Sequence, residues 1–534
     1  MKPVYLFAKI LITGGIVLAL ELAASRVLTP FFGVSLYVWS AILSVTLIAL
    51  ALGYKFGGVL AGRLGREKSL LFFAVSGALA ALWLDLCVWT YPLLFWPLSD
   101  FDLVAGSIAA CTYLLFVPLV ILSALNPVLV ALLDDKKSGG DHGAGSVFFI
   151  STIGSVLGVF FAAYGLMPHL TNYKTIVLLA ALAAGLSVLM LLMIRNFGDK
   201  NYRRALVLSV LAFVIAVGTF ASGGLERFTH LINYNNKQWR MVHAAPSYFG
   251  HVQILDVYDK EGVLLTRSLL TDGLLQNQFF RLGVSANLYT YALEKMGLEA
   301  APELNKALVL GIAAGVVPMA YANSGFTVRA VDISPEIVKA AQDFLDFQPE
   351  KMAIDYQDAR IAARRCERDY DVVAVDLFRG DGVPEHLVTQ EFFSDIKNCL
   401  RDQGVIVMNS FVDTADHRAG YALLKTVATV FDEVAYYVRP PKEDSSFTVA
   451  FLVARKNGPV GPLVASNEDV PPRLKRDMDA IMESGEVIKP DDARLKDIPV
   501  LSDVSNQWKH LAFASELAYR QGIVSKLPWQ VLMN

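Results

Sequence analysis

Residues 307–332 read ALVLGIAAGVVPMAYANSGFTVRAVD, and this stretch decides the fold of the C-terminal half of the chain. An apolar run leads into a glycine turn and a short helical pattern, and a second apolar run ends in an acid, Asp332. This order predicts a strand, a helix and a parallel strand, in which the turn lets a ligand approach the backbone and the acid can bind ribose hydroxyls. A glycine turn alone is weak evidence, because any tight strand-to-helix turn favours glycine. The acid at the expected place strengthens it.

The pattern continues as apolar strands that alternate with amphipathic helices. Strands are expected at ALVLG, FTVRAVD, MAIDYQD, YDVVAVDLF, GVIVMNSF, EVAYYV and SFTVAFLVA. Helices are expected at SPEIVKAAQDFL, QEFFSDIKNCLR and HRAGYALLKTVATVF. Such alternation predicts a Rossmann-like α/β fold with a parallel sheet covered on both faces. No helix separates the last two strands, so the final one is expected to be an antiparallel edge.

The flanking segments have other patterns. HVQILDVYD and VLLTRSLLTDG, separated by Lys260-Glu261-Gly262, predict a β-hairpin that opens a small β subdomain. The tail after residue 456 is polar and Pro-rich and then helical, which is typical of a covering or docking extension. We therefore expect a linker and small β subdomain over 223–275, the Rossmann-like domain over 276–455 and an extension over 456–534.

The first 222 residues predict a multi-pass α-helical membrane bundle of about seven spans. Apolar runs fall roughly at 4–28, 35–61, 69–97, 103–133, 145–168, 174–194 and 204–222. Each approaches or exceeds the ~20 residues that a helix needs to cross ~30 Å of hydrocarbon. Hydrophobic residues make up 54% of the chain, which also indicates a membrane protein. The fourth run carries Pro118, Asn126 and Pro127, where we expect a kink or a break.

Glu21, Arg26 and Asp85 are ionisable residues inside these runs, where a charge is costly. Glu21 could face a polar cavity between helices and serve as a substrate entry site. The alternative is an interhelical polar contact that only fixes packing, with Arg26 reaching to the interface. The sequence leaves both readings open.

Basic residues are distributed unequally between alternate loops. Eleven fall on the side of the N-terminus, namely Lys2, Lys9, Arg63, Arg66, Lys68, Lys136, Lys137, Arg195, Lys200, Arg203 and Arg204, against Arg26 and Lys174 on the other side. Since basic loops stay inside, this asymmetry predicts a cytoplasmic N-terminus. Seven spans would then place residues 223–534 on the outer face of a bacterial inner (plasma) membrane.

Charge and cysteine content exclude some classes of protein. The net charge of −3 and the lack of a basic stripe argue against a nucleic-acid partner. The four cysteines (Cys87, Cys111, Cys366 and Cys399) form no CxxC pair. We therefore expect neither a disulfide framework nor a metal site. The expected partners are the lipid bilayer and a small-molecule or membrane-associated acceptor, and a homo-oligomer remains open.

Four acids follow predicted strands: Asp272, Asp332, Asp358 and Asp376. Ligands of open parallel sheets bind beyond the carboxyl ends of the strands. A single acid at such a place is most often a helix cap or a turn residue. Four acids at one sheet edge indicate a site.

The blocks TDGLLQ, ALVLGIAAG, AVD, YQDA and VVAVDLFRGDGVPEHLVTQEFF together resemble spermidine synthase. The resemblance covers roughly residues 240–455 and is closest to the bacterial form fused behind a membrane bundle, whose membrane half resembles ELAASRVLTPFFG. It implies a methyltransferase-like Rossmann domain that binds an S-adenosyl-type nucleotide, either S-adenosylmethionine or its decarboxylated form.

The resemblance also implies roles for single residues. The nucleotide would be bound by Gly311, Gly315, Asp332, Asp358, Ala359 and Gln276. Asp376 would take the proton from the attacking amine, with Asp381 close by as a second catalytic acid. Asp272, Tyr289 and Arg379, with Glu21 in the membrane half, would contact the substrate.

The sequence departs from the family at the polyamine side of the site. Ala314 stands where the family's glycine loop carries an acid, and Arg379 stands where its DSSD motif carries a second acid. The tyrosine-glutamine pair that follows DGxxQ is absent, and Ser285-Ala286 or Tyr289 stands near that place. We therefore expect poor activity with a diamine.

Three functions remain compatible with the sequence. The first is a membrane-anchored transferase that moves an aminopropyl or methyl group from an S-adenosyl-type donor to an amine or membrane-associated acceptor. The second is an outward-facing transferase of the same fold that uses another donor on a lipid or secreted peptide. The third is a membrane transporter regulated by a nucleotide-sensing domain. The seven runs show no clear internal repeat, which argues against transport.

Overall fold

The computed structural model describes residues 3–133, 141–196, 198–281, 283–301, 303, 305–378, 382–441, 447–461, 463–464 and 467–533. The chain divides into two compact units. Unit 1 comprises Met1–Ile232, Ala245–His251 and Leu527–Asn534, and unit 2 comprises Asn233–Ala244 and Val252–Lys526.

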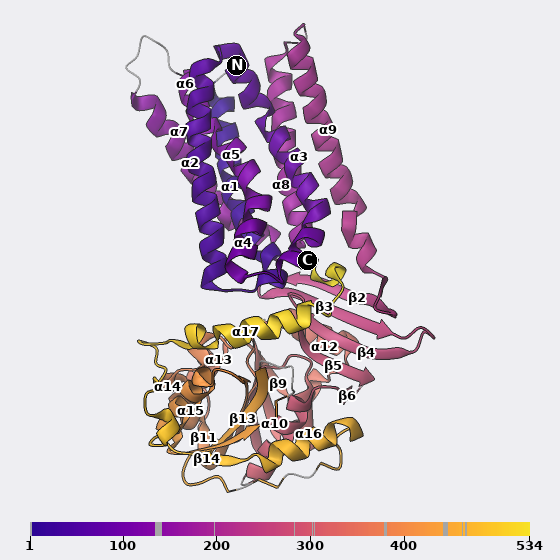
Figure 1. Ribbon diagram of the computed structural model, residues 1–534, viewed down its shortest axis with the longest axis vertical. Coiled ribbons are helices and arrows are strands. Elements are labelled where there is room, and N and C mark those ends of the chain that lie inside the picture. Colours follow the sequence, from indigo (N-terminus) through magenta and orange to yellow (C-terminus); the bar gives the residue numbers. More distant parts are fainter. Residues whose placement is uncertain are drawn as a thin grey trace. The chain divides into compact units, whose positions relative to one another are not determined.

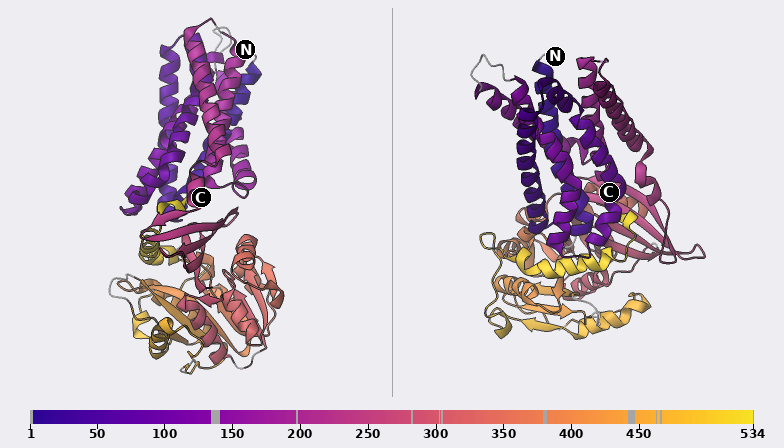
Figure 2. Two further views of the ribbon diagram at one scale, coloured as in Figure 1. Left: turned by 90° about the vertical axis from the view of Figure 1, so that its right-hand side faces the viewer. Right: turned by 45° about the horizontal axis from the view of Figure 1, so that its top comes forward.

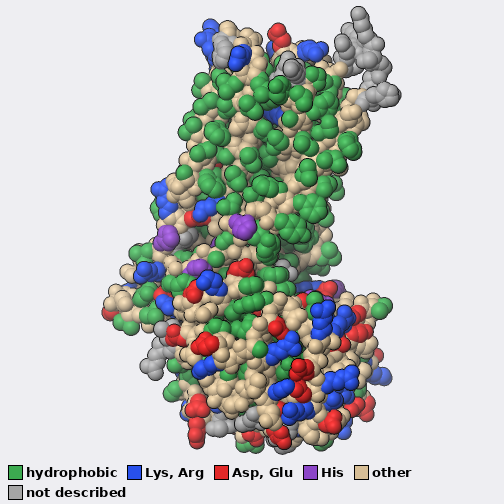
Figure 3. Space-filling model, turned by 180° about the vertical axis from the view of Figure 1, so that it is seen from behind, with side chains coloured by type: hydrophobic (Ala, Val, Ile, Leu, Met, Phe, Trp, Pro, Cys, Tyr) green, Lys and Arg blue, Asp and Glu red, His purple; other side chains and the backbone are tan. Residues whose placement is uncertain are grey.

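Unit 1 is a bundle of long helices that run side by side (Figures 1 and 2). Its helical elements are α1 (Pro3–Phe32), α2 (Leu36–Arg63), α3 (Arg66–Leu98), α4 (Leu103–Cys111), η1 (Thr112–Phe116), α5 (Val117–Ser123), α6 (Leu125–Leu133), α7 (Asp141–Phe160), η2 (Phe161–Leu166), α8 (Asn172–Ile194), α9 (Lys200–Ser222), η3 (Gly224–Thr229) and η7 (Trp529–Leu532). Within the described residues, seven helical stretches are long and apolar enough to cross a membrane. On the face in Figure 3, hydrophobic side chains cover the bundle. The predicted spans are therefore present and compatible with a multi-pass membrane protein.

The fourth stretch is interrupted near the predicted prolines. Residues 112–116 form one π-helical turn (η1), and Ala124 leaves the helical pattern between α5 and α6. The interruption falls two residues before Asn126, whose side chain donates a hydrogen bond to Ser151 Oγ at 3.2 Å. The stretch Leu103–Leu133 still counts as one span, so the break does not change the number of spans.

Two basic residues of unit 1, Lys9 and Arg26, donate hydrogen bonds to backbone carbonyl groups. Lys9 is buried in α1 and donates to the carbonyl oxygens of Phe73 (2.5 Å) and Ala74 (2.9 Å). Lys9 is therefore not a basic residue of a loop. Without it, ten basic residues remain on the side of the N-terminus against two on the other side, so the asymmetry keeps its direction. Arg26 donates to the carbonyl oxygens of Ser247 (3.1 Å) and Tyr248 (2.7 Å).

A six-stranded antiparallel sheet follows the bundle along the chain. Its order is β1-β2-β3-β4-β5-β6. The strands are β1 (Ile232–Tyr234), β2 (Lys237–Ser247), β3 (Gly250–Tyr258), β4 (Leu264–Thr271), β5 (Leu274–Arg281) and β6 (Val284–Ser285). β3 and β4 form the predicted hairpin around Lys260-Glu261-Gly262. The expected boundary between residues 275 and 276 falls inside β5.

The second sheet has eight strands in the order β14-β12-β13-β11-β10-β7-β8-β9. Its strands are β7 (Lys306–Leu310), β8 (Thr327–Asp332), β9 (Ala353–Tyr356), β10 (Tyr370–Val375), β11 (Leu400–Asp413), β12 (Val434–Val438), β13 (Phe447–Arg455) and β14 (Glu486–Ile488). The pairs β11–β10, β10–β7, β7–β8 and β8–β9 are parallel. This mixed sheet confirms the Rossmann-like prediction.

The expected antiparallel edge strand is only half right. β13 is antiparallel, but it lies between β11 and β12 and pairs with both. Its burial on both sides explains its continuous apolar sequence, FTVAFLVA. The edge is instead β14, a short strand supplied by the C-terminal extension.

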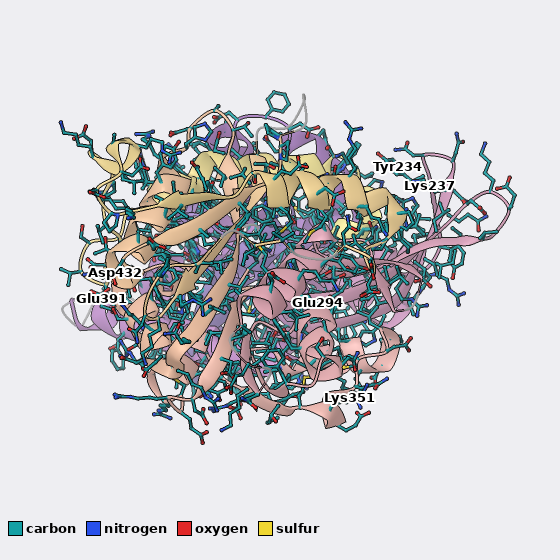
Figure 4. The ribbon with its side chains drawn as sticks, turned by 90° about the horizontal axis from the view of Figure 1, so that it is seen from below. Tyr234, Lys237, Glu294, Lys351, Glu391 and Asp432 are labelled. Carbon is teal, nitrogen blue, oxygen red and sulfur yellow. A yellow bond between two sulfur atoms is a disulfide. The ribbon has the colours of Figure 1, made fainter. Side chains whose placement is uncertain are left out.

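Helices cover both faces of the second sheet. They are α10 (Leu288–Ala300), α11 (Val316–Asn323), α12 (Pro335–Phe344), α13 (Ala359–Arg364), α14 (Gln390–Cys399), α15 (Arg418–Phe431), α16 (Pro472–Glu483) and α17 (Trp508–Val524). One core cluster joins the sheet to α13, α14, α15 and α17, and the other joins it to α10, α11, α12 and α16. In Figure 4, Glu391 of α14 and Asp432 at the end of α15 lie on one flank, away from Glu294 of α10.

A disulfide joins Cys366 to Cys399, whose Cα atoms are 5.6 Å apart. It links the segment after α13 to the end of α14. The expectation that the cysteines form no disulfide is therefore wrong. The two residues are 33 positions apart and follow no sequence motif, so only the packing of α13 against α14 brings them together.

Candidate functional site

The glycine turn lies where β7 ends, next to the end of β10. Leu310 pairs with Val375, and the Asp376 backbone N–H donates to the Leu310 carbonyl at 2.9 Å. Gly311 has φ +98°, and a Cβ atom there would collide with the Asp376 carbonyl oxygen. Only glycine allows this close approach, which brings the turn and Asp376 together.

The end of the turn also needs glycine. Gly315 has φ +77° and precedes α11, and a Cβ atom there would collide with the Phe347 ring. Ala313 also has a positive φ of 45°, which is uncommon for a residue with a side chain. Ala314, in place of the family's acid, is buried and belongs to the core with the α10–α12 layer.

Asp332 at the end of β8 is held by backbone N–H groups. Its Oδ2 accepts from Ile312 (3.0 Å) and Ala313 (3.3 Å), and its Oδ1 accepts from Ser334 (2.9 Å). Burial raises the pKa of Asp332, and these hydrogen bonds oppose the rise. The carboxylate therefore fixes the glycine turn, whatever else it binds.

Asp358 follows β9 and caps α13. Its Oδ1 accepts from the Arg360 N–H at 2.8 Å, and its Oδ2 lies 3.0 Å from His386 Nε2. Ala359, the first residue of α13, is buried. The sequence therefore places Asp358 at the expected edge, where it also has the ordinary role of a helix cap.

Asp376 follows β10 and receives a hydrogen bond from a side chain of β11. Asn409 Nδ2 donates to Asp376 Oδ1 at 3.0 Å. Burial raises the pKa of Asp376 to about 6, while the hydrogen bond from Asn409 opposes the rise. The pKa of this carboxyl group is thus closer to neutral pH than that of an ordinary aspartate, which suits a general base.

Tyr289 of α10 lies within electrostatic range of Asp376. Its hydroxyl donates to the Gln276 carbonyl at 2.8 Å and accepts from Asn277 Nδ2 at 3.2 Å. Burial raises the pKa of Tyr289 well above its ordinary value, and the charge of Asp376 adds to the effect. β5 therefore reaches the site through Gln276 and Asn277.

Four aromatic side chains gather at the ends of the same strands. Phe378 follows β10, Phe411 lies two residues before the end of β11, Phe447 begins β13, and Tyr519 comes from α17. Ring centroids are 4.9 Å apart for Phe378–Phe411, 4.8 Å for Phe411–Tyr519 and 5.2 Å for Phe447–Tyr519. We call these four residues the aromatic cluster.

Other predicted residues lie elsewhere. Asp272 (φ 49°) and Gly273 (φ 74°) form the two-residue turn between β4 and β5. The expectation that Asp272 ends a strand of the parallel sheet is therefore wrong, because the turn belongs to the antiparallel sheet. Glu21 is half-buried in α1 and belongs to unit 1. Arg379 and Asp381 lie outside the described residues.

Asn409, Asn277 and Tyr519 are site residues that the sequence patterns do not predict. Asn409 had a usable signal, since it is a polar residue near the end of an apolar strand (GVIVMNSF) whose neighbour carries Asp376. Tyr519 had none, because it is 143 residues from Asp376 in a helix that only the packing brings to this edge.

Comparisons with known proteins agree with this arrangement. Residues 286–463 match the spermine/spermidine synthase domain. A polyamine aminopropyltransferase of Vibrio vulnificus (strain CMCP6) is 29% identical over 171 residues, which are 30% of this chain and 55% of that protein. An N-terminal histidine N-methyltransferase of Emericella nidulans is 28% identical over 173 residues, 31% of each protein. The chain thus spans about half the length of the first relative and about a third of the second.

One similar solved structure is that of a probable spermidine synthase from Corynebacterium glutamicum ATCC 13032. The alignment covers 49% of this chain and 95% of that protein's chain at 16% sequence identity, with a TM-score of 0.39. The strand order, the glycine turn and the matched segment all lie in the second sheet and its helices. The C-terminal part of this chain, over residues 286–463, is therefore a spermine/spermidine synthase domain, and among the described residues it follows seven helical stretches that are long and apolar enough to cross a membrane.

Proposed function

We propose that this protein is a membrane-anchored transferase that moves an aminopropyl or methyl group from an S-adenosyl-type donor to an amine, with Asp376 as general base. The observation that carries the proposal is the contact between the glycine turn and Asp376. Gly311 touches the Asp376 backbone, and Asn409 holds the Asp376 side chain. A donor bound over the turn would therefore lie next to the base.

The turn and the neighbouring strand ends fit a nucleoside. Gly311 leaves room for a ligand at the backbone, and Asp332 and Asp358 follow β8 and β9, next to β7 in the sheet. Asp332 accepts backbone hydrogen bonds that orient its carboxylate at the end of β8, beside the glycine turn. A ribose bound over the turn would therefore lie next to this carboxylate.

Asp376 supplies the base that an amine acceptor needs. An alkylamine is mostly protonated at neutral pH and has no free lone pair with which to attack. A carboxylate with a pKa of about 6 takes a proton more readily than one near 4. The donor supplies an electrophilic carbon on sulfur, and the negative charge of Asp376 favours a cationic partner beside it.

The relatives support two kinds of transferred group. One is named for aminopropyl transfer to polyamines and the other for N-methylation of an N-terminal histidine. Both names describe alkylation of a nitrogen atom, which is the chemistry that Asp376 would assist. Which of the two groups is transferred would depend on the residues that bind the donor, where Ala314 replaces the acid expected to bind an aminopropyl chain.

A transfer assay tests the proposal. The full chain in detergent or nanodiscs would be incubated with each donor, labelled in its transferable alkyl group, and with a panel of amines. We expect labelled amine from the wild type and a loss of about 10²–10⁴-fold in Asp376→Asn. Equal rates in the two proteins would remove Asp376 from the mechanism.

The disulfide favours a second candidate, an outward-facing transferase in a bacterial inner membrane that uses another donor. Disulfides persist in oxidising compartments and are rare in the cytosol. The Cys366–Cys399 disulfide therefore favours the outer face of the membrane, as does the ten-to-two distribution of basic residues. S-adenosyl nucleotides are made and kept in the cytosol, so an outer location would require a different donor for a lipid or secreted-peptide acceptor.

Topology reporters decide between the two candidates. A C-terminal alkaline phosphatase fusion that is active, with a dark fluorescent-protein fusion, would place the domain outside and support the second candidate. Fluorescence without phosphatase activity would place it in the cytosol and support the S-adenosyl donor. Mass spectrometry of the Cys366–Cys399 peptides from alkylated cells gives an independent answer, since the outer location predicts an oxidised pair.

A further inference from the structure

Asn409 carries an unpaired hydrogen-bond acceptor next to the general base. Its side chain is 2% exposed, and its Nδ2 is used by Asp376. Its Oδ1 is buried and has no hydrogen-bond partner among the described residues. An unpaired buried acceptor costs about 1–3 kcal/mol, so a ligand that donates a hydrogen bond there would relieve the cost.

The aromatic cluster adjoins this acceptor from the same two strands. Phe411 is two residues after Asn409, and Phe378 is two residues after Asp376. All four rings of the cluster remain partly exposed although they contact one another. The site therefore combines two oxygen acceptors with an accessible apolar aromatic wall.

Helix α17 holds one part of this wall in place. Trp508 Nε1 donates to the Val383 carbonyl at 3.0 Å, and the Tyr519 hydroxyl donates to the Leu275 carbonyl at 3.3 Å. In Figure 1, α17 runs along one edge of the α/β domain. The helix lies outside the matched segment 286–463.

Among the described residues, the surroundings of Asp376 supply no charged partner for a second ammonium group of an acceptor. Burial and Asn409 account for the pKa of Asp376, and no charged side chain of the described residues contributes to it. Ala314, at the position of the family's loop acid, is apolar. A diamine would place its second ammonium group against the aromatic rings of the cluster, which costs desolvation.

We infer that the acceptor is a monoamine with an apolar or aromatic body, whose nitrogen lies between Asp376 and Asn409 Oδ1 and whose body packs on the aromatic cluster. This inference rests on the proposed function and adds the substrate class to it. The ammonium group donates one N–H to each oxygen. The body gains the free energy of apolar burial.

The proton and electron balance is complete with these groups. One proton moves from the ammonium nitrogen to the Asp376 carboxylate, which frees the nitrogen lone pair. The lone pair forms the new carbon–nitrogen bond as the carbon–sulfur bond of the donor breaks, and the donor leaves as a neutral thioether. Asn409 Oδ1 keeps the nitrogen in place through a second N–H.

Three acceptors of similar length test the inference: 2-phenylethylamine, n-butylamine and 1,4-diaminobutane. Steady-state rates with the full chain and each donor give kcat and KM for every amine. We expect the lowest KM for 2-phenylethylamine, about tenfold below that for n-butylamine, and the highest for the diamine. A diamine that is used as well as 2-phenylethylamine would overturn the inference but leave the proposed function standing. No transfer to any amine, with the donor bound, would overturn both.

Variants separate the wall from general stability. Tyr519→Leu and Phe411→Leu should raise the KM for 2-phenylethylamine about tenfold and that for n-butylamine by a smaller factor, because leucine keeps an apolar surface but lacks the ring. Tyr519→Phe keeps the ring and should retain most of the wild-type KM. Tyr421→Leu, on α15 and outside the cluster, is the matched control. Equal changes for both amines, or no change in Tyr519→Leu, would contradict the role of the cluster.

Discussion

Asn409 of β11 donates a hydrogen bond to the carboxylate of Asp376 at the end of β10, over 3.0 Å. This bond joins two neighbouring parallel strands at the edge where the glycine turn also lies. It holds the proposed base in one orientation and lowers a pKa that burial raises. The bond therefore connects the fold to the chemistry that we propose.

Replacing Asp376 with asparagine should remove turnover without harming the fold. Burial raises the pKa of Asp376 to about 6, so its contribution to stability is greatest below the pKa of the unfolded chain and is lost as pH rises through 6. At pH 7.5 the charged form is a cost, and Asp376→Asn removes it. We expect thermal unfolding at an equal or higher temperature. A clear fall in melting temperature would favour a structural role as a strand-end cap.

The pH dependence of kcat/KM should report the same group. As pH rises, Asp376 loses its proton and the rate should increase with a midpoint near pH 6. Asn409→Ala removes the donor that stabilises the charged carboxylate, so the midpoint should move to higher pH. Asn323→Ala, which alters a contact with Lys351 at the surface, is the control. A midpoint that stays fixed in Asn409→Ala would contradict the assigned contact.

Gly311 should tolerate no side chain. Gly311→Ala combines a positive φ, which costs about 1–2 kcal/mol, with a collision at the Asp376 carbonyl. Gly325→Ala has a similar φ of +102° but open space around the new Cβ atom, so it isolates the cost of the backbone. Chemical denaturation should show a larger loss for Gly311→Ala, with donor binding abolished. Equal losses in the two variants would show that the close approach has no effect.

The protein should be a poor spermidine synthase. Ala314 offers no carboxylate to an aminopropyl chain, and the aromatic cluster offers none to a diamine. With putrescine and the decarboxylated donor, we expect at most a trace of spermidine by mass spectrometry. Spermidine formation at ordinary enzymatic rates of about 1–10³ per second would contradict this prediction and indicate that the protein is a spermidine synthase.

Much of the architecture could be predicted from local patterns. Apolar runs of helical length predicted the seven helices, and alternating strands and helices predicted the mixed sheet, because both signals depend only on neighbouring residues. The position of β13 could not be predicted in this way. An apolar run is expected both for a strand between β11 and β12 and for a strand at the edge of the sheet. The neighbours of a strand are decided by contacts between residues that are far apart in the sequence.

The site was predictable only where it lies on strand ends. Asp332, Asp358 and Asp376 lie at the ends of parallel strands of one sheet, so the sequence could place them together. Asp272 was misplaced because a Thr-Asp-Gly stretch suits a strand end and a hairpin turn equally. Tyr519 and the Cys366–Cys399 disulfide depend on the packing of distant helices, which leaves no local signal.

Nucleotide titration of the purified full chain tests the account most directly. S-adenosylmethionine and its decarboxylated form would be titrated by calorimetry against the wild type, Asp332→Ala and the control Asp355→Ala, which loses the surface pair with Arg329 on the neighbouring strands. The account predicts binding of at least one nucleotide to the wild type and the control, and a loss of binding in Asp332→Ala. Absence of binding in the wild type, or equal binding in Asp332→Ala, would contradict the S-adenosyl-type transferase.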